Sequence, residues 1–260
     1  MEVRFFQVDA FARSVFRGNP AGVCPLERWP GDGLLQGIAA ENNLSETAFF
    51  VKKGPGEYDL RWFTPAVEVD LCGHATLASA YVIFRFLDPD LASVTFHTRS
   101  GPLTVERRGE LLVMDFPSRP AEPVETPPDL VRGLGVQPAE VLRSRDYLAV
   151  LGSEDDVARL APDMEALARL ECVGVIATAP GTGCDFVSRF FAPRVGVPED
   201  PVTGSAHCTL VPYWAARLGL GRLRARQISA RGGELECELR GARVRIGGHA
   251  ALYLEGTLHV

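Results

Sequence analysis

The sequence lacks any apolar run long enough to span a membrane. No stretch of about 18 consecutive apolar residues occurs in the chain. Residues 1–4 lead directly into a strand-like segment, without the charged and apolar regions that mark a secretory signal. We therefore expect a cytoplasmic protein with no membrane partner.

An excess of basic residues is missing as well. Lys and Arg together number 27 and Asp and Glu 33, which gives a net charge of −6. A chain with this balance has no general positive surface for the phosphates of nucleic acid. One cluster of arginines between residues 217 and 231 is more typical of a solvated surface. We expect no nucleic-acid partner.

Paired cysteines are also absent. The six cysteines form no CxxC pair, and no group of Cys and His has the spacing of zinc ligands. Without an export signal, these cysteines are best interpreted as free thiols in a reducing compartment. We expect no metal site.

Three motifs that would assign a function directly are missing. The sequence contains no GxGxxG dinucleotide fingerprint, no phosphate-binding P-loop and no GxSxG nucleophile elbow. These absences argue against a nucleotide-binding enzyme and against a serine hydrolase of that type. We expect no cofactor.

The most distinctive stretch that is present is Asp70-Leu71-Cys72-Gly73-His74-Ala75-Thr76. The residues after it are apolar on almost every side, which predicts a buried helix near 74–87. The first turn of such a helix offers backbone N–H groups and a partial positive charge to a carboxylate or phosphate. Gly73 would let a ligand approach the backbone closely.

A second copy of this arrangement lies in the other half of the chain. Residues 200–207 (DPVTGSAH) lead into another apolar helix, predicted near 205–218. Residues 72–75 align with residues 203–206, and an acidic residue stands shortly upstream in both copies. We interpret this as a weak internal repeat whose two helices could direct their N-termini at one ligand.

Strand patterns dominate the rest of the sequence. The expected strands lie at 3–11, 47–51, 60–63, 93–97, 101–107, 111–116, 141–144, 147–151, 174–178, 185–191, 226–231, 234–240, 242–247 and 250–260. Short helices are expected at 34–41, 128–134, 153–160 and 164–170, the third capped by Ser153, and a polar loop at 192–203. Two halves, each mostly β around one apolar helix, predict an α+β architecture.

A proline-rich segment separates the two halves. Five prolines occur within residues 117–128, which is typical of a semi-rigid, extended linker. The predicted organisation is an N-terminal half at 1–117, a linker at 118–128 and a C-terminal half at 129–260.

Several motifs together resemble a known family. The chain is similar to the phenazine biosynthesis PhzF-like family, within the larger group of diaminopimelate epimerase-like folds. The matching pieces, in the expected order over nearly the whole chain, are QVDAF (7–11), GNPAGV (18–23), LSETAF (44–49), CGHAT (72–76), RFFAP (189–193) and EDPVTGSAH (199–207).

The resemblance implies a fold and an assembly. Two pseudo-symmetric halves would each be a β-barrel-like sheet wrapped around a central apolar helix, with the active site in the cleft between them. It leaves open whether the final strand crosses back to the first half. It also implies a homodimer.

By the same resemblance, Glu46 is the acid/base residue. A carboxylate can remove a proton next to an activating group and return it to another carbon, so the reaction needs no cofactor. From the pattern alone, the favoured interpretation of Glu46 is a solvated turn residue before the strand at 47–51.

The remaining site residues are carried over in the same way. His74 would bind the substrate or support the base, and Asp200 would hold or polarise the substrate. Their alternatives are a structural histidine and a helix-capping acid. Gly73, Gly204 and Ser205 would bind the substrate carboxylate, a role compatible with Ser205 as an N-cap. His207 is interpreted as structural.

Cys72 has a separate interpretation. Epimerases of the wider fold use two facing cysteines, and Cys72 lies where the first would be, but residues 200–204 contain no second cysteine. Two-thiol racemisation is therefore disfavoured, and we expect Cys72 to be a small buried residue.

The leading hypothesis is an isomerase that moves a proton on a small unsaturated carboxylic acid. The resemblance suggests dihydro-hydroxyanthranilate-like substrates for some members and does not name the substrate here. The alternatives are a catalytically silent binding or regulatory protein of the same fold, and a racemase or epimerase.

Overall fold

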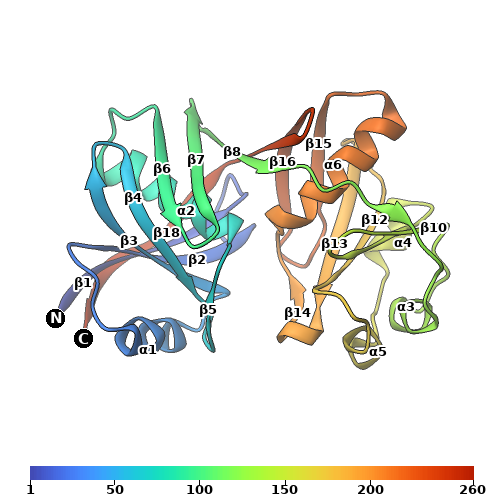
Figure 1. Cartoon of the computed structure of the whole chain (residues 1–260), viewed down its shortest axis with the longest axis horizontal. Helices are drawn as coiled ribbons and strands as arrows, with labels where there is room; N and C mark the ends of the chain where they lie inside the picture. Colours follow the sequence, from blue (N-terminus) through green and yellow to red (C-terminus); the bar gives the residue numbers. More distant parts are fainter. The chain divides into compact units, whose positions relative to one another are not determined.

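The computed structural model describes residues 1–260, which form two compact units (Figure 1). Unit 1 comprises Met1–Asp115 together with Gly247–Val260, and unit 2 comprises Phe116–Ile246. Each unit combines strands with one helix that is buried along most of its length. The predicted α+β class is confirmed.

Unit 1 is built from short and medium strands around one helix. Its helices are α1 (Asp32–Asn42) and α2 (Gly73–Val82), the latter followed by a π-helical turn at Ile83–Leu87. Its strands are β1 (Glu2–Ala10), β2 (Asn19–Leu26), β3 (Glu46–Gly54), β4 (Glu57–Phe63), β5 (Glu68–Val69), β6 (Ser93–Thr98), β7 (Gly101–Arg108), β8 (Leu111–Pro117) and β18 (Ala250–His259).

The strand order of unit 1 joins distant parts of the chain. β1 pairs antiparallel with both β2 and β18, and the β1–β18 register runs from Glu2 opposite His259 to Ala10 opposite Ala250. β2 is parallel to β3, which pairs antiparallel with β4. β4 is parallel to β6, and β6, β7 and β8 follow as antiparallel neighbours. The C-terminal strand therefore belongs to the same sheet as the N-terminal one.

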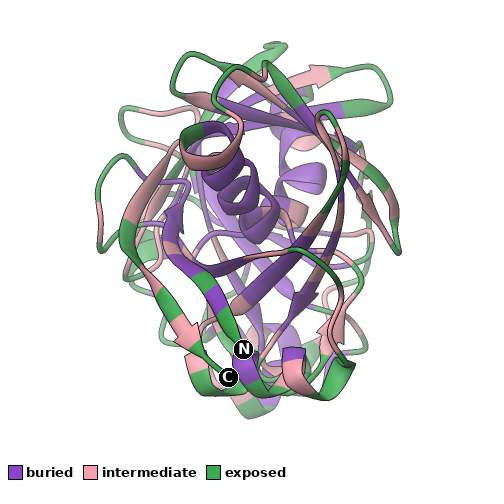
Figure 2. Cartoon of the chain, turned by 90° about the vertical axis from the view of Figure 1, so that its left-hand side faces the viewer, coloured by how far each residue is buried: buried purple, intermediate pink, exposed green.

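Helix α2 is the centre of unit 1. Eight of its ten residues are buried, as its apolar composition predicts. Figure 2 shows a buried helix enclosed by strands. Its two buried hydroxyls are satisfied within the helix, since Thr76 Oγ1 donates to the carbonyl of Cys72 and Ser79 Oγ to that of Ala75. The predicted helix at 74–87 is α-helical only as far as Val82, after which the turn widens.

Unit 2 carries the second buried helix, α6 (Gly204–Leu218). Its shorter helices are α3 (Pro128–Leu134), α4 (Glu154–Ala158), α5 (Met164–Ala168) and a 3₁₀ turn at Pro193–Val195. Its strands are β9 (Glu122–Pro123), β10 (Glu140–Arg143), β11 (Tyr147–Val150), β12 (Val175–Pro180), β13 (Phe186–Ala192), β14 (Val197–Asp200), β15 (Arg222–Gln227), β16 (Gly233–Arg240) and β17 (Arg243–Gly248).

Helix α6 contains a proline whose effect is compensated locally. Pro212 has no N–H and so leaves the carbonyl of Cys208, four residues earlier, without its helical donor. The backbone N–H of Arg119 donates to this carbonyl at 2.9 Å. The proline-rich segment thus supplies a hydrogen bond that the helix itself cannot make.

Two local predictions for unit 2 are wrong. Residues 192–203 are not a continuous polar loop, because β14 pairs with β13 and Glu199 forms a two-pronged ion pair with Arg189. The strand expected at 226–231 lies at Arg222–Gln227, where parallel pairing with β13 sets its position. The predicted Ser153 cap is confirmed, since its Oγ accepts from the N–H of Asp156.

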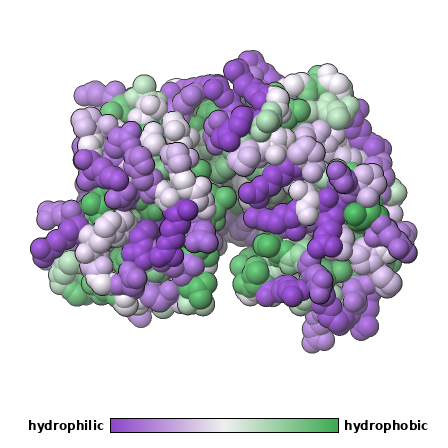
Figure 3. Space-filling model, viewed as in Figure 1, coloured by the Kyte–Doolittle hydropathy of each residue, from purple (hydrophilic) through white to green (hydrophobic).

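Hydrophilic residues predominate on the face drawn in Figure 3, and hydrophobic residues form small separate areas there. No helix of the structure combines the length and apolar character required to cross a membrane.

Candidate active site

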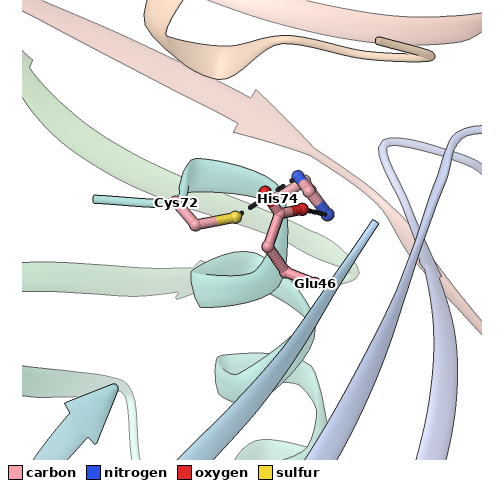
Figure 4. A group of neighbouring side chains, drawn as sticks. All are labelled: Glu46, Cys72 and His74. Atoms are coloured by element: carbon pink, nitrogen blue, oxygen red, sulfur yellow. Dashed lines mark hydrogen bonds and ion pairs between the residues drawn. The ribbon is translucent and has the colours of Figure 1, made fainter. Parts of the chain in front are cut away.

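Three chemically active side chains of unit 1 meet at the start of α2 (Figure 4). Glu46 Oε2 lies 3.1 Å from His74 Nε2, and Cys72 Sγ lies 3.4 Å from His74 Nδ1. One donor atom from each of the three residues lies within 4.8 Å of the others. The predicted acid/base residue and the predicted histidine are therefore in direct contact.

Local structure places each of these residues. Glu46 is the first residue of β3 and stands opposite Ala21 in the parallel pairing with β2. Cys72 is the N-cap of α2, and His74 is the second residue of the helix. The side chain of Glu46 is 18% exposed and that of His74 is 6% exposed. Glu46 is thus a partly buried partner of His74 rather than a solvated turn residue.

The charge state of His74 depends on its neighbours. Burial disfavours the imidazolium, but Cys72 and Glu46 favour it strongly enough to raise the pKa of His74 well above its ordinary value. Burial, with the charge of Glu46 adding to it, raises the pKa of Cys72 to about 11. Cys72 and Glu46 lie at opposite nitrogens of the ring, so both act on the charge state of His74.

Asn19 is the site residue that the sequence reasoning missed. Its Nδ2 lies 3.2 Å from His74 Nδ1, and the whole side chain is buried. An amide presents a donor or an acceptor after a half-turn, so Asn19 can bind either protonation state of the imidazole. The only signal in the sequence is its place in the GNPAGV motif, which does not reveal its partner.

The cluster also contains ligand types that a divalent metal accepts. The spacing of Cys and His in the sequence did not reveal this group, because Glu46 lies on β3 whereas Cys72 and His74 lie at the start of α2. Cys72 faces Nδ1 of the imidazole, whereas Glu46 faces Nε2. An ion bound to either nitrogen would therefore have only one of the two other residues on its own side of the ring. This arrangement disfavours an ion that is shared by all three residues.

The predicted site residues of unit 2 lie around the start of α6. The Asp200 carboxylate accepts a hydrogen bond from Thr203 Oγ1. The buried amide of Gln227 accepts from the N–H of Thr203 and donates to the carbonyl of Asp200. This network fixes the turn that leads into Gly204, and no feature of the sequence pointed to Gln227.

Two capping interpretations for α6 are wrong. The N-cap is Thr203, whereas Ser205 is already the second residue of the helix. Asp200 contacts the hydroxyl of Thr203 and lies too far upstream to be the N-cap. Ser205 Oγ instead accepts from Arg145 Nη2 at 3.1 Å, and Arg145 is paired with the buried Asp146. The roles of Asp200, Gly204 and Ser205 in substrate binding stay predictions.

His207 is a buried neutral histidine. Its Nδ1 lies 2.9 Å from the carbonyl of Thr203, so this nitrogen carries the proton and donates. Its Nε2 has no hydrogen-bond partner. Burial lowers the pKa of His207 to about 4, only partly opposed by the bond to Thr203. These contacts agree with the structural interpretation of His207.

We expect His207 to destabilise the fold in acid. The folded pKa of about 4 is below the unfolded value of about 6.5, so the unfolded chain binds more protons between these pH values. His207 therefore leaves the free energy of unfolding unreduced above about pH 6.5. As the pH drops towards 4, the free energy of unfolding falls by about 3 kcal/mol in total because of this residue. Urea unfolding measured from pH 7 to 4 should show a shallower loss for His207→Asn than for the wild type. Parallel curves for the two proteins would contradict this assignment.

Comparison with known proteins places this site in a family context. A family model described as "Phenazine biosynthesis-like protein" matches residues 8–256. An uncharacterized isomerase of Pseudomonas aeruginosa is 58% identical over 260 residues, and the match covers 100% of both chains. A crystal structure of a phenazine biosynthesis PhzF family protein from Enterococcus faecalis has a TM-score of 0.98 at 48% identity, covering 100% of both chains.

A more distant similarity concerns the fold alone. A hydroxyproline epimerase from Agrobacterium vitis has a TM-score of 0.62 at 11% identity and covers 99% of this chain and 92% of its own. The predicted diaminopimelate epimerase-like architecture agrees with this similarity to an epimerase fold.

Proposed function

Since the chain belongs to the phenazine biosynthesis-like family and is an isomerase, we propose that it moves a proton between two carbons of a small unsaturated carboxylic acid. Glu46 is the acid/base residue in this proposal. The contact of 3.1 Å between Glu46 and His74 at the start of α2 is the observation that carries it.

The proposed reaction uses one carboxylate twice. Glu46 takes a proton from a carbon adjacent to the double bond, and the electron pair of that C–H bond spreads over the conjugated system and the substrate carboxyl group. While the proton is held on the carboxylate it can exchange with solvent, and Glu46 then delivers a proton to another carbon of that system, so that the double bond shifts. Atoms and charge balance without a cofactor.

His74 supports this reaction in two ways. Its imidazolium is held by Glu46, so it orients the carboxylate and keeps a positive charge close to the developing anion. The first turn of α2 begins at Gly73 and presents backbone N–H groups, which suit the substrate carboxylate. Gly73 and His74 therefore keep their predicted roles in this proposal.

Two alternatives are less well supported. A racemase that uses a thiolate base needs an ionised cysteine, yet the pKa of Cys72 is raised to about 11. A silent binding protein has no chemical need for a carboxylate paired with a buried imidazole. We therefore keep proton transfer by Glu46 as the proposed function.

Deuterium exchange tests this proposal. The wild-type protein is incubated in D₂O with β,γ-unsaturated carboxylic acids, including but-3-enoate and a dihydro-hydroxyanthranilate, and mass spectrometry follows deuterium uptake at carbon. We expect uptake together with migration of the double bond. Butanoate serves as the saturated control and should take up none.

Other outcomes separate the alternatives. Exchange at the α-carbon of chiral acids, with loss of optical activity and no double-bond migration, would support the racemase instead. Absence of exchange in all unsaturated acids would contradict the proposal and favour the binding protein.

A further inference from the structure

Two exposed aromatic side chains of unit 1 lie against each other. Phe16 is 68% exposed and Tyr253 is 48% exposed, yet their ring centroids are 5.6 Å apart in an edge-on arrangement. Phe16 belongs to the loop between β1 and β2, and Tyr253 belongs to β18. A contact between two large exposed rings from distant parts of the chain requires an explanation beyond core packing.

Both rings stand at backbone irregularities. Phe16 has a φ of +69°, a left-handed conformation that is unfavourable for a residue with a Cβ. Tyr253 is the extra residue in a β-bulge, because Gln7 pairs with Leu254 whereas Val8 pairs with Leu252. Bulges redirect side chains and are frequent beside active sites, as is backbone strain.

The position of Phe16 is fixed on several sides. Its N–H donates to the buried carboxylate of Asp9 at 2.8 Å. The N–H of Ala12, at the other end of the loop, donates to the carbonyl of His249 at 3.1 Å. The strained residue therefore presents its ring from an anchored loop, and a pre-positioned ring loses little freedom when it binds a ligand.

The loop leads directly into the candidate active site. Asn19, three residues after Phe16, contacts His74 at 3.2 Å. Three residues span at most about 11 Å of extended chain. The Cα atom of Phe16 therefore lies at most about 11 Å from that of Asn19, the residue in contact with His74.

We propose that Phe16 and Tyr253 form an aromatic platform that binds the planar, conjugated part of the substrate and selects it over saturated acids of the same charge. This inference rests on the proposed function, because it assigns the substrate class of the same site. Rings of this kind hold a flat π-system by edge or offset contacts. Such contacts favour the planar ligand by about 2- to 12-fold in affinity.

Calorimetric titration of the full chain with benzoate and with cyclohexanecarboxylate tests the platform. Both acids carry one carboxylate on a six-membered ring, and only benzoate is planar and aromatic. We expect the wild type to bind benzoate several-fold more tightly, and Phe16→Leu to bring the two dissociation constants close to each other. The affinity for cyclohexanecarboxylate should stay within about twofold, since aromatic contacts do not contribute to it.

Two further variants control for folding and for general apolar surface. Phe16→Gly removes the ring and also relieves the left-handed strain, so its thermal midpoint should not fall although the preference is lost. Leu220→Ala removes an exposed apolar side chain of unit 2 and should keep the wild-type preference.

The remaining outcomes overturn the platform. One is an unchanged preference for benzoate over cyclohexanecarboxylate in Phe16→Leu, and another is no binding of either acid at millimolar concentration. The third is a change of oligomeric state in Phe16→Leu, measured by light scattering, which would make the aromatic pair a contact between copies of the chain. Deuterium exchange with an unchanged preference would overturn only the platform. A preference that depends on Phe16 without any exchange would overturn only the proposed reaction.

Discussion

Replacing Glu46 by glutamine is expected to lower the rate of deuterium exchange by about 10²- to 10⁴-fold, the usual contribution of a positioned acid or base. Glutamine has nearly the same shape as glutamate but cannot accept a proton from carbon. Glu41→Gln makes the same substitution at an exposed position of α1 and should leave the exchange rate unchanged. Exchange that survives in Glu46→Gln would assign the base to another residue.

The same substitution should also move the pKa of His74, which NMR titration of the imidazole can follow. Glu46 lies beside Nε2 of the ring and, together with Cys72, favours the buried imidazolium. Without Glu46, only Cys72 still opposes the effect of burial, so the pKa of His74 should fall from its wild-type value. Glu41→Gln, at an exposed position of α1, is the matched control and should leave the pKa of His74 unchanged. An unchanged pKa in Glu46→Gln would contradict the assigned ion pair.

The sign of the stability effect follows from these pKa values. In the wild type, the folded pKa of His74 is raised, so its stabilising contribution is complete below about pH 6.5 and is lost as the pH rises through the folded value. In Glu46→Gln the folded pKa of His74 is lower than in the wild type, so this stabilising contribution is smaller and is lost at a lower pH. The difference in unfolding free energy between the two proteins should therefore grow from pH 9 to pH 6.

Replacing Gly18 by alanine is expected to reduce the free energy of unfolding by roughly 2 to 5 kcal/mol. Gly18 has a φ of +66°, and a Cβ there would lie 2.1 Å from the carbonyl oxygen of Ala10 and 2.9 Å from the Cβ of Ala12. The backbone must move to accept it, because neither atom belongs to the end of a flexible side chain. Chemical denaturation measures the loss.

Gly109→Ala separates the clash from the strain. Gly109 has a similar φ of +64°, but no atom lies within 4 Å of the position of its Cβ. Its loss should be only about 1 to 2 kcal/mol. The backbone shift at Gly18 should also displace the neighbouring Asn19 from His74 and slow the exchange, whereas Gly109→Ala should not. Equal losses of unfolding free energy in the two variants would show that the loop after β1 moves enough to relieve the clash at Gly18.

Features that depend on local patterns can be predicted from the sequence alone. An apolar stretch without a polar face predicts a buried helix, and a Gly-His pair at its start predicts backbone N–H groups next to a titratable ring. Helix α2 confirms this from Gly73 onward, with its buried residues on all sides. The motif around Glu46 predicts an acid/base role for this residue through its resemblance to a family, to which the chain belongs.

The contacts between the site residues depend on the tertiary structure. Glu46 and His74 are 28 positions apart and Asn19 and His74 are 55 positions apart, so their contacts depend on how β2, β3 and α2 pack. The pairing of β18 with β1, the position of β14 beside β13 and the bulge at Tyr253 likewise arise from strand register. Hydrogen bonds between strands join residues far apart in the chain, and a local sequence pattern records the burial of each strand but not its neighbour.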